Sequence, residues 1–243
     1  MRVATLLGFA AVLALGLVLS GWLVGRGFAE GRRSERFVTV KGLAEREVRA
    51  DLALWPLRYV ATGNDLIEVQ RKVTEDGGRV RAFLAAGGLT ADVISGQGVE
   101  VVDLLAQPYR SGPVESRFIV SETLMVRTTD IDKVLERSSR LGDLVATGVV
   151  LGGQDGGPIR GPVYLFTRLN DIKPPMIEEA TRNAREGAAR FAADAQSRIT
   201  GIRRASQGMF EIRPRDDVPG ASEQNQVDKT VRVVSTIDYA LAD

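Results

Sequence analysis

Carboxylates are the side chains with which this chain could do chemistry. Glu45, Glu47 and Asp51 form an acidic cluster near the start of an expected strand. Two carboxylates that face one cleft at a controlled separation can act as acid and nucleophile. Sequence spacing does not demonstrate such a cleft, so charge at a turn and a strand edge is the interpretation we favour. A carboxylate-based hydrolase around Glu45 and Asp51 stays open as an alternative, and we assign no catalytic residue.

Missing residue types exclude many other reactions. The chain has no His and no Cys, so it cannot build a Ser-His-Asp triad, a thiolate nucleophile, or a zinc site with His or Cys ligands. Carboxylate, Lys, Tyr and Ser/Thr chemistry remains, together with oxygen-ligated Mg²⁺ or Ca²⁺. Without cysteine, the redox compartment cannot be inferred from disulfides.

Two loops could bind ions but lack the required patterns. Gly152 to Gly157 is rich in glycine, yet it has no Gly-Lys-Ser/Thr ending and is not expected to lead into a helix. Asp216 and Asp217 are adjacent acids without the ligand spacing of a calcium loop. We expect a turn or hairpin at the first segment and solvated charge at the second. The sequence therefore predicts no metal and no cofactor.

Arginines near the carboxyl end could contact an anionic surface. They stand at Arg203, Arg204, Arg213 and Arg215, with acids beside them and no basic aromatic platform. Lys and Arg total 32 against 31 Asp and Glu, so no global field attracts nucleic acid. We expect no nucleic-acid partner.

The longest periodic stretch runs from Pro174 to Thr200, with Gly201 as the expected stop. Its apolar residues recur at spacings of three and four: Ile177, Ala180, Ala184, Ala188, Phe191, Ala195 and Ile199. This alanine-rich face predicts a helix that lies close against a sheet, with Phe191 and the isoleucines as large anchors. The opposite face alternates in charge every four residues, which favours a solvated stripe over a docking surface: Glu178, Arg182, Glu186, Arg190, Asp194 and Arg198.

Shorter patterns predict the other elements. Asp65 and Glu68 have capping-box spacing and begin a helix that Gly87 ends. Gly77-Gly78 in this helix costs about 1 kcal/mol per glycine, which favours a kink or a close backbone contact. Pro56 at a phase change favours a bulge or an edge position. Strands are expected at 37–41, 48–59, 93–104, 117–128, 163–166, 202–212 and 229–241, a helix at 130–145 and a mobile loop at 213–226.

These elements predict an α+β fold with largely antiparallel sheets and about three helices. The order strand, Asn-Asp, helix, strand, loop, strand covers roughly residues 48–128 and again 159–241. This hints at two β-α-β-β units with helix 130–145 as the connector. With 243 residues and 44% hydrophobic content, the chain can bury one large or two small domains.

The amino terminus has the pattern of a membrane segment. Val3 to Gly25 carries no charge and lies between Arg2 and Arg26. As a helix it would be about 35 Å long, enough for a bilayer. We favour an uncleaved anchor with Trp22 near an interface, while a cleavable signal stays open. Residues 1–29 are therefore assigned as anchor or signal, 30–36 as a short tether and 37–243 as the main domain.

The opening of the main domain resembles a known family. Val38 to Ala53, Val-Thr-Val-Lys-Gly-Leu-Ala-Glu-Arg-Glu-Val-Arg-Ala-Asp-Leu-Ala, is similar to the start of SIMPL domains: a strand, a glycine, an acidic turn and an Asp-x-Ala strand. The alanine-rich helix before a strand pair is similar too, and the resemblance covers roughly residues 37–241. It implies an α+β domain carried into the bacterial periplasm, often oligomeric, linked to envelope stress tolerance and without established catalytic residues.

Charge and resemblance disagree on orientation. Arg26, Arg32, Arg33 and Arg36 follow the span whereas Arg2 precedes it, and the positive-inside rule alone would keep the main domain in the cytoplasm. Large domains translocate despite such charge, so we expect a single-pass inner-membrane protein with its domain in the periplasm.

Taken together, these observations predict a non-enzymatic, membrane-tethered envelope protein. It would act by self-association as a homo-oligomer or by binding a protein partner that the sequence does not identify, because exposed strand edges can add to a neighbouring sheet. A small-ligand carrier and the carboxylate-based hydrolase are the alternatives.

Overall fold

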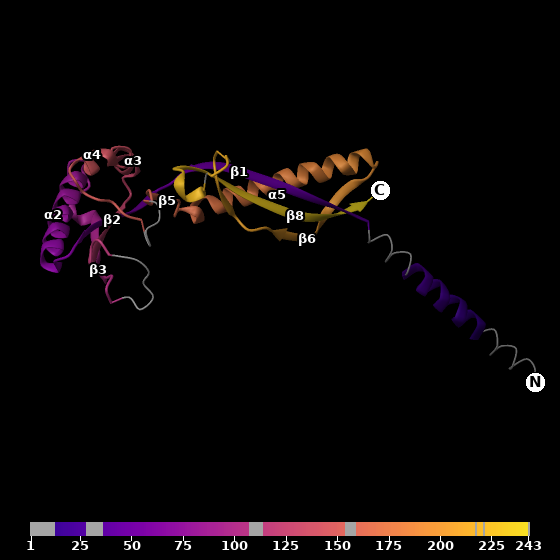
Figure 1. Cartoon of the computed structure of the whole chain (residues 1–243). Coiled ribbons are helices and arrows are strands. Elements are labelled where there is room, and N and C mark those ends of the chain that lie inside the picture. Colours follow the sequence, from indigo (N-terminus) through magenta and orange to yellow (C-terminus); the bar gives the residue numbers. More distant parts are fainter. Residues whose placement is uncertain are drawn as a thin grey trace, which may run out of the picture. The chain divides into compact units, whose positions relative to one another are not determined.

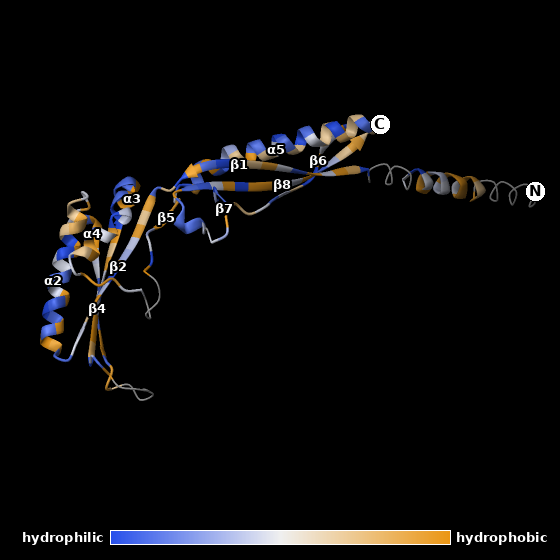
Figure 2. Ribbon diagram, turned by 45° about the horizontal axis from the view of Figure 1, so that its top comes forward, coloured by the Kyte–Doolittle hydropathy of each residue, from blue (hydrophilic) through white to orange (hydrophobic). Residues whose placement is uncertain are grey.

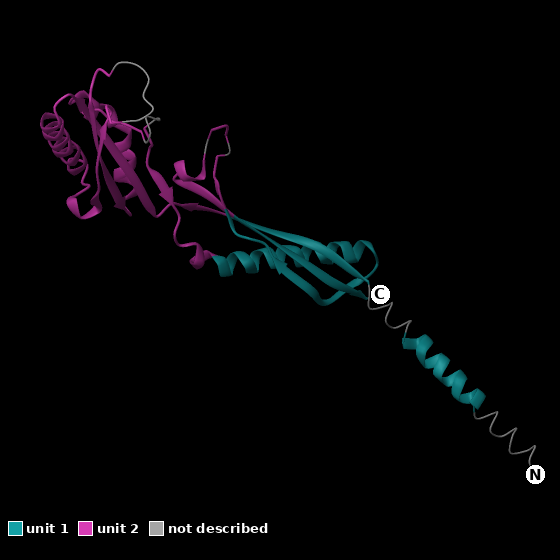
Figure 3. Cartoon of the chain, turned by 60° about the horizontal axis from the view of Figure 1, so that its bottom comes forward, with its two compact units in different colours: residues 1–45, 173–211, 232–243 teal, residues 46–172, 212–231 magenta. Residues whose placement is uncertain are grey.

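The structure is a computed structural model that describes residues 13–27, 36–106, 114–153, 159–216, 218–220 and 222–242 (Figure 1). It has the predicted α+β fold with antiparallel sheets. The chain divides into two compact units (Figure 3). Unit 1 contains residues 1–45, 173–211 and 232–243, and unit 2 contains residues 46–172 and 212–231.

Unit 2 is built on a sheet with the strand order β3-β4-β2-β5. The strands are β2 (Leu52–Gly63), β3 (Ile94–Asp103), β4 (Phe118–Thr128) and β5 (Val163–Leu165). The antiparallel pairing of 93–104 with 117–128 is confirmed by β3 and β4, which have a register shift between Gly96 and Val99. Strand β2 pairs along its whole length with β4 and, at Leu52 to Leu54, with β5.

Helices pack on one face of this sheet: α2 (Leu66–Ala85), α3 (Ile131–Ser139) and α4 (Leu141–Ala146), with a short η1 turn (Ala91–Val93). The core consists of large side chains, among them Trp55, Leu57, Val73 and Leu84. In Figure 2, α2 is mostly hydrophilic in colour whereas β4 is mostly hydrophobic. The predicted single helix at 130–145 is wrong in detail, because the backbone leaves helical geometry at Arg140 between α3 and α4.

Three local predictions in unit 2 can be checked. The Asp65 carboxylate caps α2 by accepting bonds from Ile67 N (2.8 Å) and Glu68 N (3.1 Å), as predicted. A Cβ atom on Gly77 would lie 2.6 Å from the Tyr59 hydroxyl, which confirms a close contact rather than a kink. At Pro56, β2 and β4 continue in register without a bulge. Pro56 instead lies between the β5 pairing and the Tyr59–Leu151 bridge, where a missing N–H is tolerated.

Unit 1 contains most of the second antiparallel sheet, whose order is β1-β8-β6. These strands are β1 (Phe37–Arg49), β8 (Asp228–Ala242) and β6 (Arg198–Gln207), and β7 (Glu211–Pro214) also pairs with β8. Leu241 N donates to Arg36 O (3.0 Å) and Ala50 N donates to Val227 O (2.8 Å), so β1 and β8 run antiparallel. The first strand therefore continues through Gly42 to Arg49, and the prediction of a turn at residues 42–47 is wrong.

Helix α5 (Leu169–Asp194) lies along one side of this sheet (Figure 3). The predicted alanine face is confirmed, because Met176, Ala180, Ala184, Ala188 and Ala192 are buried. A Cβ atom on Gly42 would lie 1.8 Å from Ala180 O and 2.6 Å from Ala184 N, so only glycine allows this approach. Gly42, for which the sequence suggested a turn, is thus the position at which β1 packs against the backbone of α5.

The predicted ends and anchors of this helix are wrong. It begins at Leu169, so Pro174 and Pro175 lie inside it, and it ends at Asp194. Gln196 adopts a positive φ of 52° and Ser197 N donates to Ala192 O (2.8 Å), which closes the helix without glycine. Phe191 is 63% exposed because the buried row continues at Ala192, four residues after Ala188. Ala195 follows the helix, and Ile199 belongs to β6.

The second repeat predicted for residues 159–241 is wrong in its first strand, although the two sheets share a strand order. In unit 2, β2, α2, β3 and β4 follow one another, and β4 lies between β3 and β2. Around α5, β8 likewise lies between β6 and β1. Strand β5, expected to begin the second repeat, pairs with β2 instead. Strand β1, from the start of the domain, takes its place.

Residues 13–27 are helical, and their apolar side chains are exposed. The Arg26 guanidinium stacks 5.1 Å from the centre of the exposed Trp22 ring. Among the described residues, no helix is both long enough and apolar enough to cross a membrane. Residues 3–12 of the predicted span and most of the predicted tether, residues 30–35, lie outside the described residues.

Candidate functional site

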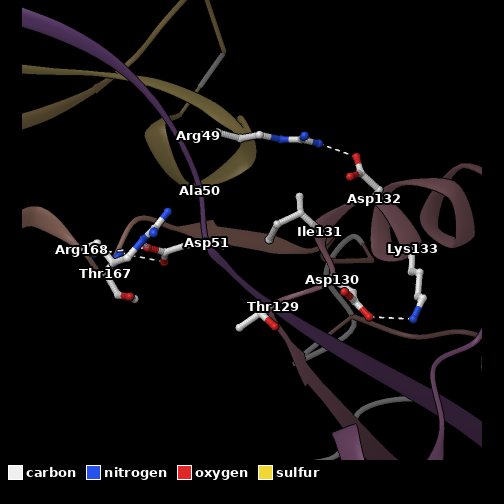
Figure 4. A pocket seen from close by; sticks show the side chains of 10 residues that line it. All are labelled: Arg49, Ala50, Asp51, Thr129, Asp130, Ile131, Asp132, Lys133, Thr167 and Arg168. Carbon is white, nitrogen blue, oxygen red and sulfur yellow. Dashed lines mark hydrogen bonds and ion pairs between the residues drawn. The ribbon is translucent and has the colours of Figure 1, made fainter.

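A pocket of about 690 Å³ in unit 2 has six charged side chains in its lining (Figure 4). It is formed by the link between β1 and β2, the start of α3 and the segment before α5. Its charged residues are Arg49, Asp51, Asp130, Asp132, Lys133 and Arg168. Of the three acids predicted from sequence, it includes Asp51.

The Asp51 carboxylate holds residues 167 and 168, which precede α5, through hydrogen bonds. Its side chain is 16% exposed and accepts hydrogen bonds from Thr167 N (2.9 Å), Arg168 N (3.2 Å) and Arg168 Nε (3.2 Å). Burial acts to raise the pKa of Asp51, but the hydrogen bonds from Thr167 and Arg168 outweigh it and lower the pKa below its ordinary value. Asp51 is thus a stably ionised, positioning carboxylate.

The other two carboxylates of the pocket have cations of their own. Asp130 pairs with Lys133 (2.6 Å) and Asp132 pairs with Arg49. In Figure 4 the three carboxylates point to different sides, each toward its own partner. Within the described ranges no cluster of three or more acids, His or Cys is arranged to hold a metal ion. Each of these carboxylates is thus held by a cation, and none forms a hydrogen bond to another carboxylate among the described residues.

A carboxylate site around Glu45 and Asp51 is the alternative that the sequence leaves open, and in the structure these two side chains have different partners. Glu45 lies in unit 1 and pairs with Arg232 (3.6 Å), whereas Asp51 lies in unit 2 and pairs with Arg168. Glu47 is an exposed residue near the end of β1. Glu45 and Glu47 lie on β1, which is an edge strand of its sheet, and not at a turn. The strand-edge part of the favoured interpretation fits them, and the turn part does not.

The glycine-rich segment runs beside β2. Gly152 N donates to Arg58 O (3.0 Å), and Arg58 in turn donates to Gly153 O (2.7 Å). Arg58 also binds Glu100 (2.8 Å) and Ser121 (2.8 Å) next to a pocket of about 360 Å³. This guanidinium is committed to internal partners. Most of the segment for which a turn or hairpin was predicted is not described. Residues 154–158 lie outside the described residues.

The polar loop after β7 is more ordered than predicted. Arg215 binds Asp216 (2.9 Å) and Asp228 (2.9 Å), and Gln226 hydrogen bonds to both backbone groups of Asp216. A hydrogen bond from Arg215 lowers the pKa of Asp216. Asp217 lies outside the described residues. The interpretation of Asp216 as loop charge therefore holds, with Arg215 as its partner.

Several buried polar groups escaped sequence reasoning. Lys229 is fully buried and pairs with Glu223 (2.6 Å) in the short η3 turn (Glu223–Asn225). Asp76 is buried on α2 and pairs with Lys72 and with Arg79 (2.8 Å). The spacing of Lys72, Asp76 and Arg79 could have indicated the second cluster. Both clusters satisfy buried charge and leave no free reactive group among their members.

Tyr59 and Arg137 are buried side chains whose hydrogen-bonding capacity is not fully used. The Tyr59 hydroxyl and Arg137 Nε have no hydrogen-bond partner within the described residues. Burial, followed by the nearby Glu122 carboxylate, raises the pKa of Tyr59 above its ordinary value. Arg137 stacks on Phe83 (5.2 Å) and lies against Gly87 after the end of α2, where a cation is favourable.

The second candidate site is the β6 edge. Strand β6 pairs with β8 on one side, and within the described residues no strand pairs with its other side. Every residue from Arg198 to Gln207 except Ile199 is exposed. The opposite edge of the sheet is partly covered, because Asn183 Nδ2 of α5 donates to Leu43 O (2.8 Å). The backbone groups on this side of β6 therefore have no strand partner among the described residues, and an edge of this kind can accept a further strand.

The exposed strand edges expected from the sequence correspond, in part, to the outer side of β6. Strand β6 has register shifts between Ile199 and Gly201 and between Ile202 and Arg204. Such bulges restrict indiscriminate pairing. Its regular part is the segment from Arg204 to Gln207, which stays in register with Ser235 to Asp238. The sequence predicted one strand at 202–212, which includes this segment, whereas the structure has β6 up to Gln207 and a separate β7 from Glu211. The sequence did not show that β6 is the edge strand, because β6 has neither a buried face nor strict alternation.

Two comparisons with known proteins bear on the identity of the chain. None of the curated proteins compared with the chain matches it. The model of the SIMPL family, described as a protein of unknown function (DUF541), matches residues 38–239. This match covers both sheets and all the helices that pack on them. The chain therefore belongs to the SIMPL family.

Proposed function

We propose that this protein is a non-catalytic envelope protein that acts by self-association through the free edge of β6. We further propose that its amino-terminal helix anchors it in the bacterial inner membrane, with the main domain in the periplasm. Envelope stress tolerance is the setting that the family resemblance implies. The observation that carries the proposal is the exposed, unpaired edge of β6.

The chemistry of the edge supports this role. An unpaired strand presents backbone N–H and C=O groups that a second strand can satisfy without a dedicated side-chain site. The segment from Arg204 to Gln207 has a regular register, whereas the part before it is bulged. Pairing is then confined to a short stretch, which favours a defined contact over open-ended aggregation.

The absence of catalysis is part of the same proposal. Asp51, Asp130 and Asp132 each have a cationic partner, and the low pKa of Asp51 makes it a poor proton donor. Glu45 likewise pairs with Arg232. These pairings support a structural role for the carboxylates that sequence reasoning singled out.

Sedimentation tests the self-association. We expect the full chain in mild detergent to sediment as an oligomer and the Ser206→Lys variant to shift toward monomer, because Lys on an edge opposes strand addition. Ser222→Lys makes the same change at an exposed position outside β6 and should leave the oligomer intact. A strictly monomeric native chain would end the proposal.

A fusion tests the location. Alkaline phosphatase fused after Asp243 should be active if the main domain reaches the periplasm, and an inactive fusion at normal expression would place it in the cytoplasm. Extraction of the membranes with alkaline carbonate distinguishes an anchored chain, which stays in the pellet, from a cleaved form, which is released.

A small-ligand carrier is the second candidate function. The pocket of about 690 Å³ favours it, because ligand sites commonly measure roughly 300–1,000 Å³. Its charged lining indicates a zwitterionic ligand rather than an apolar one. Thermal shift against a set of amino acids and short peptides tests this candidate, with Asp132→Asn as the variant that should lose any shift.

A further inference from the structure

The face of the β1-β8-β6 sheet opposite α5 is exposed in unit 1. Val40, Ile237 and Tyr239 face α5 and pack in one cluster with Ala184 and Ala188 of that helix. The alternate residues face the other way, and Thr39 Oγ1 donates there to Asp238 (2.7 Å). Register places Arg204 opposite Asp238 and Arg198 opposite Ala242 on this outward side.

Basic residues dominate one part of this outward face. Lys41, Arg198, Arg203 and Arg204 are all exposed, and we call them the basic face. Arg203 stacks 5.1 Å from the Phe37 ring. Within the described residues none of the four forms an ion pair, whereas Asp238 accepts from Thr39 and Glu45 pairs with Arg232. The positive charge is therefore available to an outside partner.

The basic face lies near the point where the chain enters the β1-β8-β6 sheet. Phe37 begins β1, and the segment that joins Gly27 to Arg36 spans at most about 30 Å when extended. Arg26 and Trp22 stack near the end of the apolar helix, a pair typical of a membrane interface. A bilayer that holds this helix would lie within reach of the basic face.

We propose that the basic face docks on the anionic surface of the phospholipid bilayer in which the amino-terminal helix is anchored. This inference rests on the membrane tether of the proposed function. The basic face and the bilayer surface are complementary in charge, because exposed guanidinium and ammonium groups that form no internal ion pair with the described residues can contact lipid phosphates. The β6 edge lies in the plane of the sheet and stays available for a second copy while the face is occupied.

The expected strength follows from the number of cations. Each basic residue near an anionic lipid surface favours the docked state by about fivefold. Loss of Arg198, Arg203 and Arg204 should then shift the equilibrium away from docking by about a hundredfold. The attraction is screened over about 10 Å at 0.1 M salt, so docking should weaken as salt is added.

A fluorescence experiment on the full chain measures docking. The chain contains no cysteine, so Thr236→Cys on the outward face of β8 gives a single labelling site opposite Ser206. The labelled protein is reconstituted into phosphatidylcholine vesicles with or without phosphatidylglycerol, and quenching by headgroup nitroxide lipids is recorded. We expect strong quenching with the anionic lipid, little without it, and loss of quenching at high salt.

Matched variants locate the charge. Arg198→Gln, Arg203→Gln and Arg204→Gln together should abolish the quenching that depends on phosphatidylglycerol. The same change at Arg182, Arg185 and Arg190, exposed on α5, should leave it unchanged. A label at Ala193→Cys on α5 reports the other side of the sheet and should stay unquenched.

The outcomes separate this inference from the membrane tether. Flotation with vesicles after carbonate treatment tests the tether alone, in either lipid. A protein that floats but shows no anionic-lipid quenching, or that loses it equally with both triple variants, overturns the docking proposal. Relief of quenching by inorganic phosphate beyond that by chloride at equal ionic strength would instead identify a phosphate site and also overturn it.

Discussion

The two units place one long helix on an antiparallel sheet by opposite means. In unit 2, α2 contributes Val69, Val73, Val80 and Leu84 to a core that contains Trp55, Leu57 and Tyr59. In unit 1, α5 contributes alanines, and its backbone approaches Gly42 of β1. Unit 2 gains stability from buried side-chain volume, whereas unit 1 depends on close approach of backbones. The first arrangement is sensitive to removal of atoms and the second to their addition.

Gly42→Ala should have the largest effect. The added methyl would lie 1.8 Å from Ala180 O and 2.6 Å from Ala184 N, which are backbone atoms that cannot move aside alone. We expect a loss of about 3 kcal/mol or more, seen as lost hydrogen-exchange protection in α5. Gly201→Ala, on β6 of the same sheet with no atom within 4 Å, is the control. Equal protection in both variants would refute the close-approach account of unit 1.

Leu84→Ala tests the opposite sensitivity. Leu84 is fully buried in the core of unit 2, and such truncation costs about 2–5 kcal/mol. Trp55 reports on unit 2 once Trp22, the other of the two tryptophans, is replaced by Phe. Urea unfolding followed by this fluorescence should show a lower midpoint. If Leu84→Ala reduced hydrogen-exchange protection in α5 as much as it destabilised unit 2, the two units would unfold together rather than independently.

Gly77→Ala and Gly78→Ala should have opposite signs. At Gly77 a Cβ atom meets the buried Tyr59 hydroxyl at 2.6 Å, whereas at Gly78 nothing lies within 4 Å. We expect Gly77→Ala to destabilise unit 2 by about 1–3 kcal/mol and Gly78→Ala to stabilise it by about 1 kcal/mol. Thermal unfolding of the two variants side by side measures the difference. If both substitutions stabilised unit 2, the Tyr59 side chain would have to move aside to accommodate the new methyl group at position 77.

Gln196→Gly should give the smallest effect, a gain in unit 1. Gln196 holds a positive φ of 52° at the end of α5, which costs a residue with a side chain about 1 kcal/mol relative to glycine. Protection of the last turn of α5 should increase in hydrogen exchange. Gln196→Ala keeps a Cβ atom and should bring no gain, so a gain in both variants would count against backbone strain.

Local patterns determined much of this protein. The capping carboxylate of Asp65, the buried row Ala180, Ala184 and Ala188, the antiparallel pair β3 and β4 and the α+β class all follow from short-range spacing. These features depend on which face of one element is apolar and on which residue can end it. Such properties are encoded within a few turns of the chain, so the sequence determined them without knowledge of partners.

The tertiary structure alone decided which strands pair and which charges meet. Any strand offers the same backbone donors and acceptors. The local sequence therefore did not indicate that β1 would pair with β8 and β5 with β2. Gly42 has the residue type of a turn, and only contact with α5 explains it as a packing position. Asp51 and Arg168 are far apart in sequence and meet through the fold. Pairings of this kind depend on contacts between distant segments, and a single sequence does not encode them in its periodicity.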